Sequence, residues 1–471
     1  MSLTPQQQTI VDHIKSTDGL TLINAVAGAG KTYTLLQIAK AVNSNNGLYL
    51  AYNKAIATEA KSKFPKTIHC CTTHSLAYGP TIGTRKTAPS FFNYRDIKEL
   101  KSYEEKLEFI DIFKQFCLSK FTTFQAFCDE YSLPSSYATL GSRYFKLMAE
   151  DKIAYPHEFY LKLFHILLAT DQLTYEPFDL IMLDEAGDLN EVTLEIFNLL
   201  PSTKKVMVGD PHQNIYTFNH TINCFKIMES KGVSFPMSKS FRVADHIAQR
   251  IEKFCRKYMH EDMAFEGLTL DDTTIKDRAY IARTNTSLVS KMMELNELGT
   301  PYTLTRHPDN IFKLLLLICG LKPNSFITNP EYKHLQDDVN YYYKNRHSLA
   351  EQYKTLFSFL IDEHSSDKTL TNSIRLVSKW GANSIVACYK EAKKHMKSKT
   401  NYYLGTAHSM KGLEADEVTI SPCMNEAIID AISFVQTQPD ATIPEDMLVE
   451  LNLYYVACSR ARKKLINALH L

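Results

Sequence analysis

The most regular hydrophobic signal near the amino terminus is a strand followed by a glycine turn and a helix. Residues 20–26 form a short apolar run, which is typical of a buried parallel strand. After the turn, apolar residues recur at helical spacing over 35–42, so we expect a helix that begins at Lys31. A second apolar run at 47–52 follows at the distance expected of a βαβ unit.

Further apolar runs, each bounded by polar turn residues, continue this pattern along the chain. They lie at 178–183, 206–208, 279–282, 402–404 and 418–420. Helical patterns separate several of these runs, which predicts parallel sheets layered with helices and therefore the α/β fold class.

Two long stretches interrupt the alternation of strands and helices. From about 80 to 177 and from about 309 to 400, the chain is rich in Phe, Tyr, Lys and Glu at helical spacing, and we predict mostly helical insertions there. A length of 471 residues also favours more than one core. The expected domains are a first lobe (1–79 and 178–235), its insertion (80–177), a second lobe (236–308 and 401–471) and its insertion (309–400).

Composition excludes some classes of protein. The 53 basic residues nearly balance the 52 acidic ones, so bulk charge cannot hold this chain to nucleic acid and any phosphate-binding surface must be local. The polar segment 1–8 lacks the features of a secretory signal, and the longest apolar run, 314–321, is too short to span a bilayer. We expect a soluble intracellular protein without a membrane partner, cytoplasmic or, in a eukaryotic cell, nuclear.

The cysteines indicate no special chemistry. Ten are scattered along the chain, with no Cys-x-x-Cys pair and no Cys/His spacing typical of metal ligands. We therefore expect neither a disulfide framework nor a structural zinc site.

The first glycine turn carries a phosphate-binding pattern. The segment from Ala25 to Thr32 matches G-x-x-x-x-G-K-[ST], except that Ala25 replaces the first glycine. Gly28 and Gly30 let the backbone curl so that successive N–H groups face a phosphate chain. We expect Lys31 to reach the outer phosphates of ATP and the Thr32 hydroxyl to hold Mg²⁺. The alternative is a plain glycine turn before a helix, and the strand and helix on either side favour the phosphate loop.

Polar groups follow two later strands. The run at 178–183 leads directly into Asp184 and Glu185, which predicts a metal-binding carboxylate and a second one that takes a proton from the attacking water. Such a pair is common on solvated helices, but a position after a wholly apolar strand disfavours that interpretation. After the run at 206–208, Gln213 is a candidate for sensing the terminal phosphate.

Together these residues resemble the superfamily 1 helicases of the UvrD/Rep type, and within that group the motor region of the F-box DNA helicase. The matching segments occur in the order of the family's motifs. They are 3–7, 27–32, 52–54, 72–75, 184–188, 209–218, 240–242, 406–414 and 454–461. The resemblance implies two RecA-like P-loop NTPase lobes with parallel sheets, each carrying a mainly helical insertion.

The resemblance also implies roles around the nucleotide. Gln7 would pair with the adenine edge and Phe241 would stack on adenine, while Arg242 and Arg460 would reach the γ-phosphate from the second lobe. ATP would neutralise the charges of these two arginines only when the two lobes close around it, and hydrolysis would remove this contact and let the lobes open. Such a lobe movement, coupled to alternating grip on a strand, would make a translocating motor. The other implied nucleotide-binding positions are Ala27, Gly28, Ala29, Gly30, Lys31, Thr32, Tyr33 and Glu414.

Other motifs imply contacts with single-stranded DNA. The candidate residues are Tyr52, Asn53, Thr73, His74, Tyr216, Phe218 and His408. Stacking of a base on an aromatic ring contributes roughly 1–3 kcal/mol and tolerates any sequence. For each aromatic residue or histidine, the alternative is a packed core position. The basic stretch 390–399 can follow phosphates, but such runs are more often solvated helix faces, which is the interpretation we favour.

Two positions depart from the family pattern. In the family, the motif matched by 184–188 usually ends in Gln-Asp, and here Gly187 precedes Asp188. An arginine usually follows the last aromatic of the motif matched by 209–218, and here Asn219 stands in that place. Because the hydrolytic residues are kept, both departures concern the coupling of hydrolysis to DNA.

We therefore expect an ATP-dependent DNA helicase that uses Mg²⁺ and acts as a monomer on single-stranded DNA and on single-strand/duplex junctions. The resemblance implies 3′ to 5′ movement, a role in replication, recombination or repair, and partners among replication or recombination proteins. One alternative is a translocase that strips proteins from DNA or acts on RNA with little unwinding. Another is a DNA-binding scaffold without catalysis.

Overall fold

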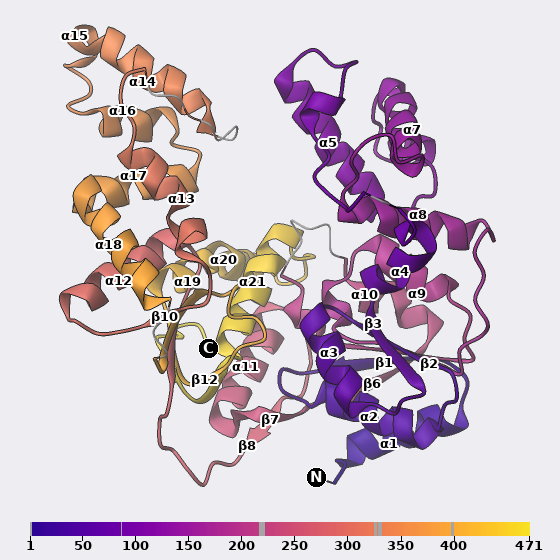
Figure 1. The fold of residues 1–471 in the computed structure, drawn as a ribbon. Coiled ribbons are helices and arrows are strands. Elements are labelled where there is room, and N and C mark those ends of the chain that lie inside the picture. Colours follow the sequence, from indigo (N-terminus) through magenta and orange to yellow (C-terminus); the bar gives the residue numbers. More distant parts are fainter. Residues whose placement is uncertain (1, 86, 216–221, 325–326, 328–331, 397–399) are drawn as a thin grey trace. The chain divides into compact units, whose positions relative to one another are not determined.

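The computed structural model describes residues 2–85, 87–215, 222–324, 327, 332–396 and 400–471 (Figure 1). The chain divides into two compact units. The first comprises Met1–Phe241 with Ala264–Glu266, and the second comprises Arg242–Met263 with Gly267–Leu471.

A six-stranded parallel sheet forms the centre of the first unit. Its strand order is β3-β2-β4-β5-β1-β6. The inner strands are apolar and buried, whereas the edge strand β6 contains Pro236, which an edge tolerates because it needs hydrogen bonds on one side only. The strands are β1 (Gly19–Ala25), β2 (Gly47–Ala51), β3 (Ile68–Thr72), β4 (Leu180–Leu183), β5 (Lys204–Gly209) and β6 (Val233–Met237).

Helices connect these strands. The first helix begins with a capping box in which Thr4 and Gln7 satisfy each other's backbone N–H groups. This helix, α1 (Pro5–Ser16), precedes β1, and the helices between strands are α2 (Lys31–Val42), α3 (Lys54–Lys63), α4 (Thr73–Ile82), α9 (Glu191–Leu199) and α10 (Cys224–Met228). Short 3-10 turns lie at Tyr94–Asp96, Ala186–Asp188, Pro211–Gln213 and Glu229–Lys231.

A helical subdomain separates β3 from β4 in the sequence. It contains α5 (Tyr103–Leu118), α6 (Phe124–Glu130), α7 (Ser135–Ala149) and α8 (His157–Ala169). Figure 1 shows α5 and α7 at the end of the first unit opposite α1 and α2. Aromatic rings fill its core: the centroids of Phe116 and Phe124 lie 4.2 Å apart, and those of Phe145 and Phe159 lie 4.8 Å apart.

One lysine lies inside this aromatic core. Lys162 on α8 has no exposed surface, and its Nζ donates to the carbonyl oxygens of Ser119 at 2.7 Å and Phe121 at 2.6 Å. The same nitrogen lies 4.8 Å from the centre of the Phe116 ring. Burial lowers the pKa of Lys162 to about 7, because the apolar surroundings disfavour the charged form.

A second parallel sheet, of five strands in the order β10-β11-β9-β12-β13, forms the centre of the second unit. These strands are β9 (Arg278–Ala282), β10 (Thr303–Leu304), β11 (Tyr402–Thr406), β12 (Ala415–Ile420) and β13 (Ala461–Ile466). A separate two-stranded sheet consists of β7 (Lys239–Ala244) and β8 (Glu266–Leu268).

Helices also surround the second sheet, and a second helical subdomain separates β10 from β11. The helices outside the subdomain are α11 (Asp245–Tyr258), α12 (Asn285–Glu297), α19 (Pro422–Ala427), α20 (Ile429–Thr437) and α21 (Glu445–Cys458). The subdomain contains α13 (Pro308–Cys319), α14 (His334–Lys344), α15 (Arg346–Leu349), α16 (Leu356–Glu363), α17 (Lys368–Trp380) and α18 (Ala382–His395).

The predicted fold class is confirmed. The two large sheets are parallel, helices connect successive strands, and the helix expected at Lys31 begins there. The exact domain limits stay a prediction. Among the residues that the structure describes, no helix has both the length and the apolar character needed to cross a bilayer.

Candidate nucleotide-binding and DNA-contacting residues

The glycine turn after β1 forms the phosphate-loop backbone at the carboxyl edge of the first sheet. Gly28 and Gly30 have φ values of 77° and 80°, in the left-handed region that favours glycine. Gly30 directly precedes α2, whose first N–H groups therefore lie at this edge. Of the other implied positions, Ala27 and Ala29 are buried and Tyr33 lies in the first turn of α2.

An ion pair joins the loop to the end of β4. Lys31 Nζ lies 2.7 Å from Glu185 Oε2. Burial lowers the pKa of Lys31, but the nearby carboxylates of Glu185, Asp184 and Asp210 outweigh that effect and raise its pKa above the ordinary value. The lysine is therefore held as a cation where the loop amides converge.

Asp184 is the buried centre of a group of oxygen atoms. Its Oδ2 accepts hydrogen bonds from Thr32 Oγ1 at 3.2 Å and Tyr49 Oη at 2.6 Å, and its Oδ1 accepts from the Glu185 N–H at 2.9 Å. Burial raises the pKa of Asp184 and the Glu185 charge adds to this, whereas Lys31 and Tyr49 oppose the shift. A hydroxyl and a carboxylate this close are the hard oxygen ligands that Mg²⁺ prefers.

Tyr49 is a site residue that sequence reasoning missed. It lies on β2, which pairs with β4, and its side chain has no exposed surface. The available signal was a tyrosine within an apolar strand, because a buried phenol needs a hydrogen-bond partner.

The segment after β4 packs closely on the segment after β5. Glu185 has a φ of 54°, a left-handed value uncommon for a residue with a side chain. Gly187 follows in a 3-10 turn, and a Cβ added there would lie 2.7 Å from the carbonyl oxygen of Asp210. The glutamine usual at this family position therefore does not fit this backbone.

Gln213 lies in the turn that follows β5. Its Nε2 donates to Asp210 Oδ2 at 2.8 Å, and the other carboxylate oxygen accepts from the His212 N–H at 3.1 Å. Gln213 is buried, and its amide is oriented by Asp210. Its role in sensing phosphate stays a prediction.

Gln7 links α1 to the phosphate loop. Its Oε1 accepts from the Thr4 N–H at 3.0 Å, and its Nε2 donates to the Ala29 carbonyl at 3.3 Å and to Thr34 Oγ1 at 3.0 Å. The side chain is buried. These bonds give Gln7 a structural role, and the adenine contact stays a prediction.

The segment after β6 lies against the same loop. Ser240 Oγ donates to the Ala27 carbonyl at 2.8 Å, and the Phe241 N–H donates to the Gly28 carbonyl at 2.8 Å. The Phe241 residue is 43% exposed, so this aromatic is both anchored to the loop and open to a stacking partner.

Four predicted DNA contacts gather at the carboxyl ends of β2 and β3. The two strands are neighbours, with Ala51 paired to Thr72, so the residues that follow each strand lie at one edge of the sheet. Tyr52 is 45% exposed, and Asn53 caps α3 by accepting from the Ile56 N–H at 3.0 Å.

The two candidates that follow β3 are less open. Thr73 is buried. The ring of His74 meets that of Tyr160 edge to face at 5.7 Å, and burial lowers the pKa of His74, which favours its neutral form. Tyr216 and Phe218, like Asn219, lie outside the described residues, and their roles stay predictions.

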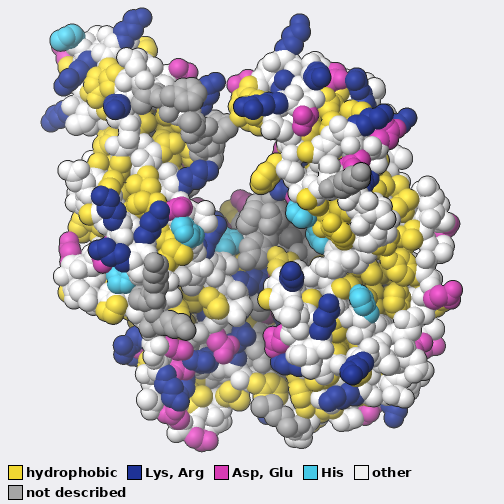
Figure 2. Space-filling view, in the orientation of Figure 1, with side chains coloured by type: hydrophobic (Ala, Val, Ile, Leu, Met, Phe, Trp, Pro, Cys, Tyr) yellow, Lys and Arg dark blue, Asp and Glu magenta, His cyan; other side chains and the backbone are white. Residues whose placement is uncertain are grey.

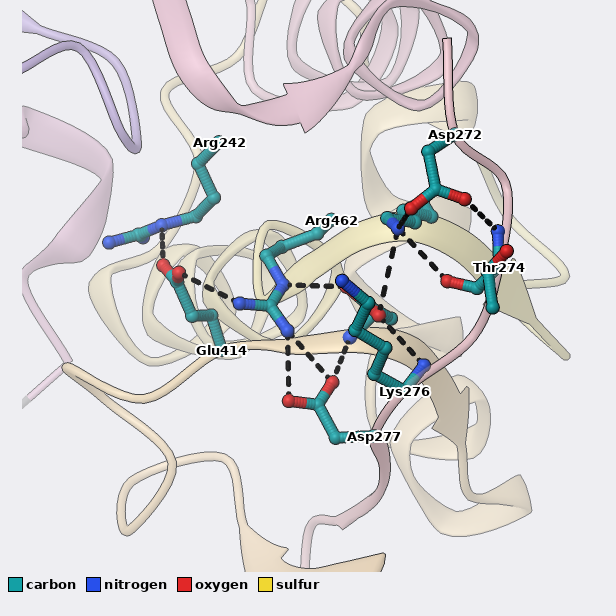
Figure 3. A network of polar contacts seen from close by, with 9 residues as sticks. Arg242, Asp272, Thr274, Lys276, Asp277, Glu414 and Arg462 are labelled. Carbon is teal, nitrogen blue, oxygen red and sulfur yellow. Dashed lines mark hydrogen bonds and ion pairs between the residues drawn. The ribbon is translucent and has the colours of Figure 1, made fainter. Parts of the chain in front are cut away.

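In the second unit, two residues implied in nucleotide binding form an ion pair. Arg242 Nε lies 2.5 Å from Glu414 Oε2 (Figure 3). Glu414 also faces Arg462 at 3.5 Å, and Arg462 in turn pairs with Asp277 at 2.8 Å. Asp277 and Glu414 directly precede β9 and β12, so this network lies at the amino edge of the second sheet.

Arg460 and His408 lie elsewhere on the same unit. Arg460 follows α21 and is 1% exposed, with Nε donating to the Val456 carbonyl at 3.0 Å and an Nη donating to Ser459 Oγ at 3.2 Å. His408 is half-buried and follows β11 at the carboxyl edge of the sheet. The phosphate contact of Arg460 and the DNA contact of His408 stay predictions.

The basic stretch has acidic neighbours. Lys393 lies 3.0 Å from Asp309 and Lys394 lies 2.6 Å from Glu391, whereas Lys397 and Lys399 lie outside the described residues. On the face shown in Figure 2, basic side chains are spread over both units with acidic ones among them. These pairs support the interpretation of a solvated helix face.

Comparisons with known proteins confirm the predicted resemblance to UvrD-like helicases. Residues 7–219 match the family described as an AAA domain, and residues 148–470 match the UvrD-like helicase C-terminal domain. F-box DNA helicase 1 of Gallus gallus is 25% identical over 541 aligned residues, covering 99% of this chain and 49% of the relative. F-box DNA helicase protein 1 of Schizosaccharomyces pombe is 24% identical over 522, covering 98% of this chain and 57% of the relative.

The chain spans about half the length of these two relatives. The UvrD-like match nevertheless extends over most of the chain, from residue 148 to residue 470, and it includes the whole second sheet. The chain belongs to the UvrD-like helicase family.

Proposed function

We propose that this chain is an ATP-dependent DNA helicase that moves along single-stranded DNA, in the 3′ to 5′ direction, and separates duplexes. The observation that carries the proposal is the convergence of Lys31, Thr32, Asp184 and Glu185 at one sheet edge, joined by an ion pair of 2.7 Å and a hydrogen bond of 3.2 Å. Separate segments of the chain supply the parts that phosphoryl transfer requires.

In this proposal, the loop amides and Lys31 bind the phosphates of ATP. Thr32 and Asp184 would hold Mg²⁺, and the bound ion would supply charge neutralisation at the phosphate oxygens. Glu185 exchanges its contact with Lys31 for the attacking water and accepts a proton from it. The exposed ring of Phe241 stacks on the adenine ring of ATP.

The second unit supplies positive charge to the terminal phosphate. The side chain of Arg242 is oriented by its ion pair with Glu414, in which Nε lies 2.5 Å from Oε2. During turnover, phosphate would replace the Glu414 carboxylate as the partner of Arg242. We assign the same phosphate contact to Arg460. An arginine that exchanges partners when ATP is hydrolysed couples the chemistry to a change of conformation.

Single-stranded DNA is the proposed track. Tyr52, Asn53, Thr73 and His74 lie together at one sheet edge, and the exposed Tyr52 ring provides a stacking surface. Tyr216, Phe218 and His408 complete the proposed contacts. We propose a monomer that acts at single-strand/duplex junctions in the nucleus or cytoplasm, with replication or recombination proteins as partners.

Strand displacement on duplexes with a 3′ or a 5′ overhang tests the proposal. We expect ATP-dependent displacement from the 3′ overhang only, together with ATPase stimulation by single-stranded DNA. Stimulation without displacement would instead identify a translocase, and greater activity on matched RNA would identify an RNA motor. Absence of DNA-stimulated hydrolysis would contradict the proposal and favour a scaffold.

A further inference from the structure

Two histidines and an aspartate meet at the surface of the second helical subdomain. His334 is the first residue of α14, Asp338 lies one turn later on that helix, and His364 directly follows α16. His364 Nε2 lies 2.9 Å from Asp338 Oδ2, and the ring centres of the two histidines are 5.0 Å apart.

The geometry is close to that of a metal site. One ligand atom from each residue can be chosen so that all three lie within 4.8 Å of one another. Ligand atoms around a tetrahedral zinc ion, bound at about 2.0–2.1 Å, are about 3.3 Å apart. Side-chain rotations that bring the ligand atoms about 1.5 Å closer together therefore suffice to form the site.

The backbone that carries these side chains is well supported. Beneath the surface cluster, Leu335 and Val339 of α14 and Leu360 of α16 are buried in the core of the subdomain. The rings of Tyr342 and Phe359 connect the same two helices, with centroids 5.5 Å apart. Such packing fixes the helices before any ion binds, which lowers the entropic cost of assembling a site.

The cluster is also accessible to ions. His334 is exposed, and the side chains of His364 and Asp338 are 17% and 25% exposed. Partial exposure gives an ion an entry path. The 2.9 Å contact between His364 Nε2 and Asp338 Oδ2 already places two ligand atoms together, and an ion bound by both would replace the proton that they share.

We propose that His334, Asp338 and His364 bind one Zn²⁺ ion that joins α14 to the end of α16. Two imidazole nitrogens and one carboxylate suit zinc and disfavour Mg²⁺ and Ca²⁺, which prefer oxygen ligands. Three protein ligands leave one coordination position for water or an external donor. None of these three residues is among the proposed nucleotide or DNA contacts, so the zinc proposal does not rest on the proposed function.

The proposal departs from the expectation of no structural zinc. That expectation rested on Cys-containing patterns and short spacings, whereas this set has no cysteine. Its two helices bring together Asp338 and His364, which are 26 residues apart in the sequence. Only the fold reveals the combination.

Calorimetric titration of the metal-free full chain with Zn²⁺, in excess Mg²⁺ and without nucleotide, tests the proposal. We expect one site whose affinity falls about tenfold or more in His334→Gln and in His364→Gln. His347→Gln, at an exposed histidine in α15 of the same subdomain, is the matched control and should bind Zn²⁺ like the wild type.

Co²⁺ substitution identifies the ligands independently. We expect visible ligand-field absorption without the near-ultraviolet bands of cobalt–thiolate bonds, and loss of the visible absorption in His334→Gln. His334 is exposed, so His334→Gln should keep the wild-type circular dichroism. Its cobalt absorption therefore tests the ligand assignment even if His364→Gln unfolds. A wild type without a saturable zinc site, thiolate bands, or wild-type affinity in His334→Gln would overturn the proposal.

Discussion

Gly187 lies directly against the main chain of Asp210. A Cβ on residue 187 would stand 2.7 Å from the Asp210 carbonyl oxygen, and a Cβ on Gly209 would stand 2.9 Å from the Gly187 nitrogen. The main chain of the segment that carries Glu185 thus lies directly against the main chain of the segment that carries Gln213. In this chain, close packing takes the place of the amide side chain usual at position 187.

We predict that Gly187→Ala forces these two segments apart. Overpacking of this kind should lower the free energy of unfolding by about 1–3 kcal/mol. Displacement of Gln213 should reduce ATP turnover by roughly 10- to 100-fold with a smaller change in nucleotide affinity. Urea unfolding, steady-state ATPase assays and nucleotide-binding titrations measure the three quantities.

The matched control for this variant is Gly320→Ala at the end of α13, where the backbone φ is −90° and an added Cβ meets its nearest neighbour at an ordinary 3.5 Å. It should leave turnover unchanged and change the free energy of unfolding by no more than about 0.5 kcal/mol. Wild-type turnover and stability in Gly187→Ala would contradict the close-packing argument.

We predict that Glu185→Gln separates nucleotide binding from hydrolysis. The amide oxygen can still accept a hydrogen bond from Lys31 but cannot take a proton, so turnover should fall by about 10²- to 10⁴-fold while ATP binds. The control is Glu59→Gln, whose side chain is 64% exposed in its pair with Lys63. A Glu185→Gln enzyme with wild-type turnover would reject the site assignment.

Lys31→Ala should give a different pattern. It removes both the phosphate contact and the cation that opposes the raised pKa of Asp184. We expect loss of DNA-stimulated hydrolysis, weaker ATP binding and a fold that remains largely intact. Nucleotide titration beside circular dichroism distinguishes these effects, and undiminished hydrolysis would contradict the assignment.

We predict that Arg242→Ala lowers turnover by about 10²- to 10³-fold and nucleotide affinity much less, because its charge acts mainly in the transition state. The control is Arg278→Ala, which breaks a 3.2 Å pair with Glu417 in the same unit. Arg460→Ala should likewise lose far more turnover than nucleotide affinity, and it should also lose stability because Arg460 is buried. Equal losses of turnover and binding would count against either arginine.

We predict that buried Lys162 makes the free energy of unfolding depend on pH above about pH 7. Its folded-state pKa of about 7 lies below the ordinary 10.5, so between these values the unfolded chain binds a proton that the folded chain does not. Stability therefore rises with pH across this window, by up to about 1.4 kcal/mol per pH unit. Lys162→Met should lack this contribution to the slope.

Urea unfolding of both proteins at about pH 7 and about pH 9 measures the difference. The unpaired carbonyl oxygens in Lys162→Met lower its stability at every pH, so the slope is the informative quantity. Lys146→Met, at a side chain 77% exposed on α7, is the control and should keep the wild-type slope. Parallel profiles for Lys162→Met and the wild type would contradict the lowered pKa.

The strands found from the sequence and those missed differ in position. All seven predicted strands are inner strands of the two large sheets, where both faces and both edges are covered and apolar residues dominate. The strands that the apolar runs did not indicate include all four edges, β3, β6, β10 and β13. Edge strands tolerate a proline in β6 and basic residues in β13, which weakens their hydrophobic signal.

The candidate site shows a similar division. Residues within short motifs, such as Lys31 and Asp184, could be predicted because their spacing follows from local backbone geometry. The partners of these residues, such as Tyr49 for Asp184, come from separate strands. Such pairings depend on sheet register and loop path, which no local pattern encodes.

Tyr49 lies three residues before Tyr52 on the same segment of chain. Its phenol spans one strand-to-strand spacing, about 4.8 Å, to hold Asp184. A ligand that shifts β2 and a ligand that rearranges Asp184 thus act on one shared hydrogen bond. Thermodynamic linkage makes the coupling reciprocal. If bound DNA changes the affinity for nucleotide by some factor, bound nucleotide changes the affinity for DNA by the same factor.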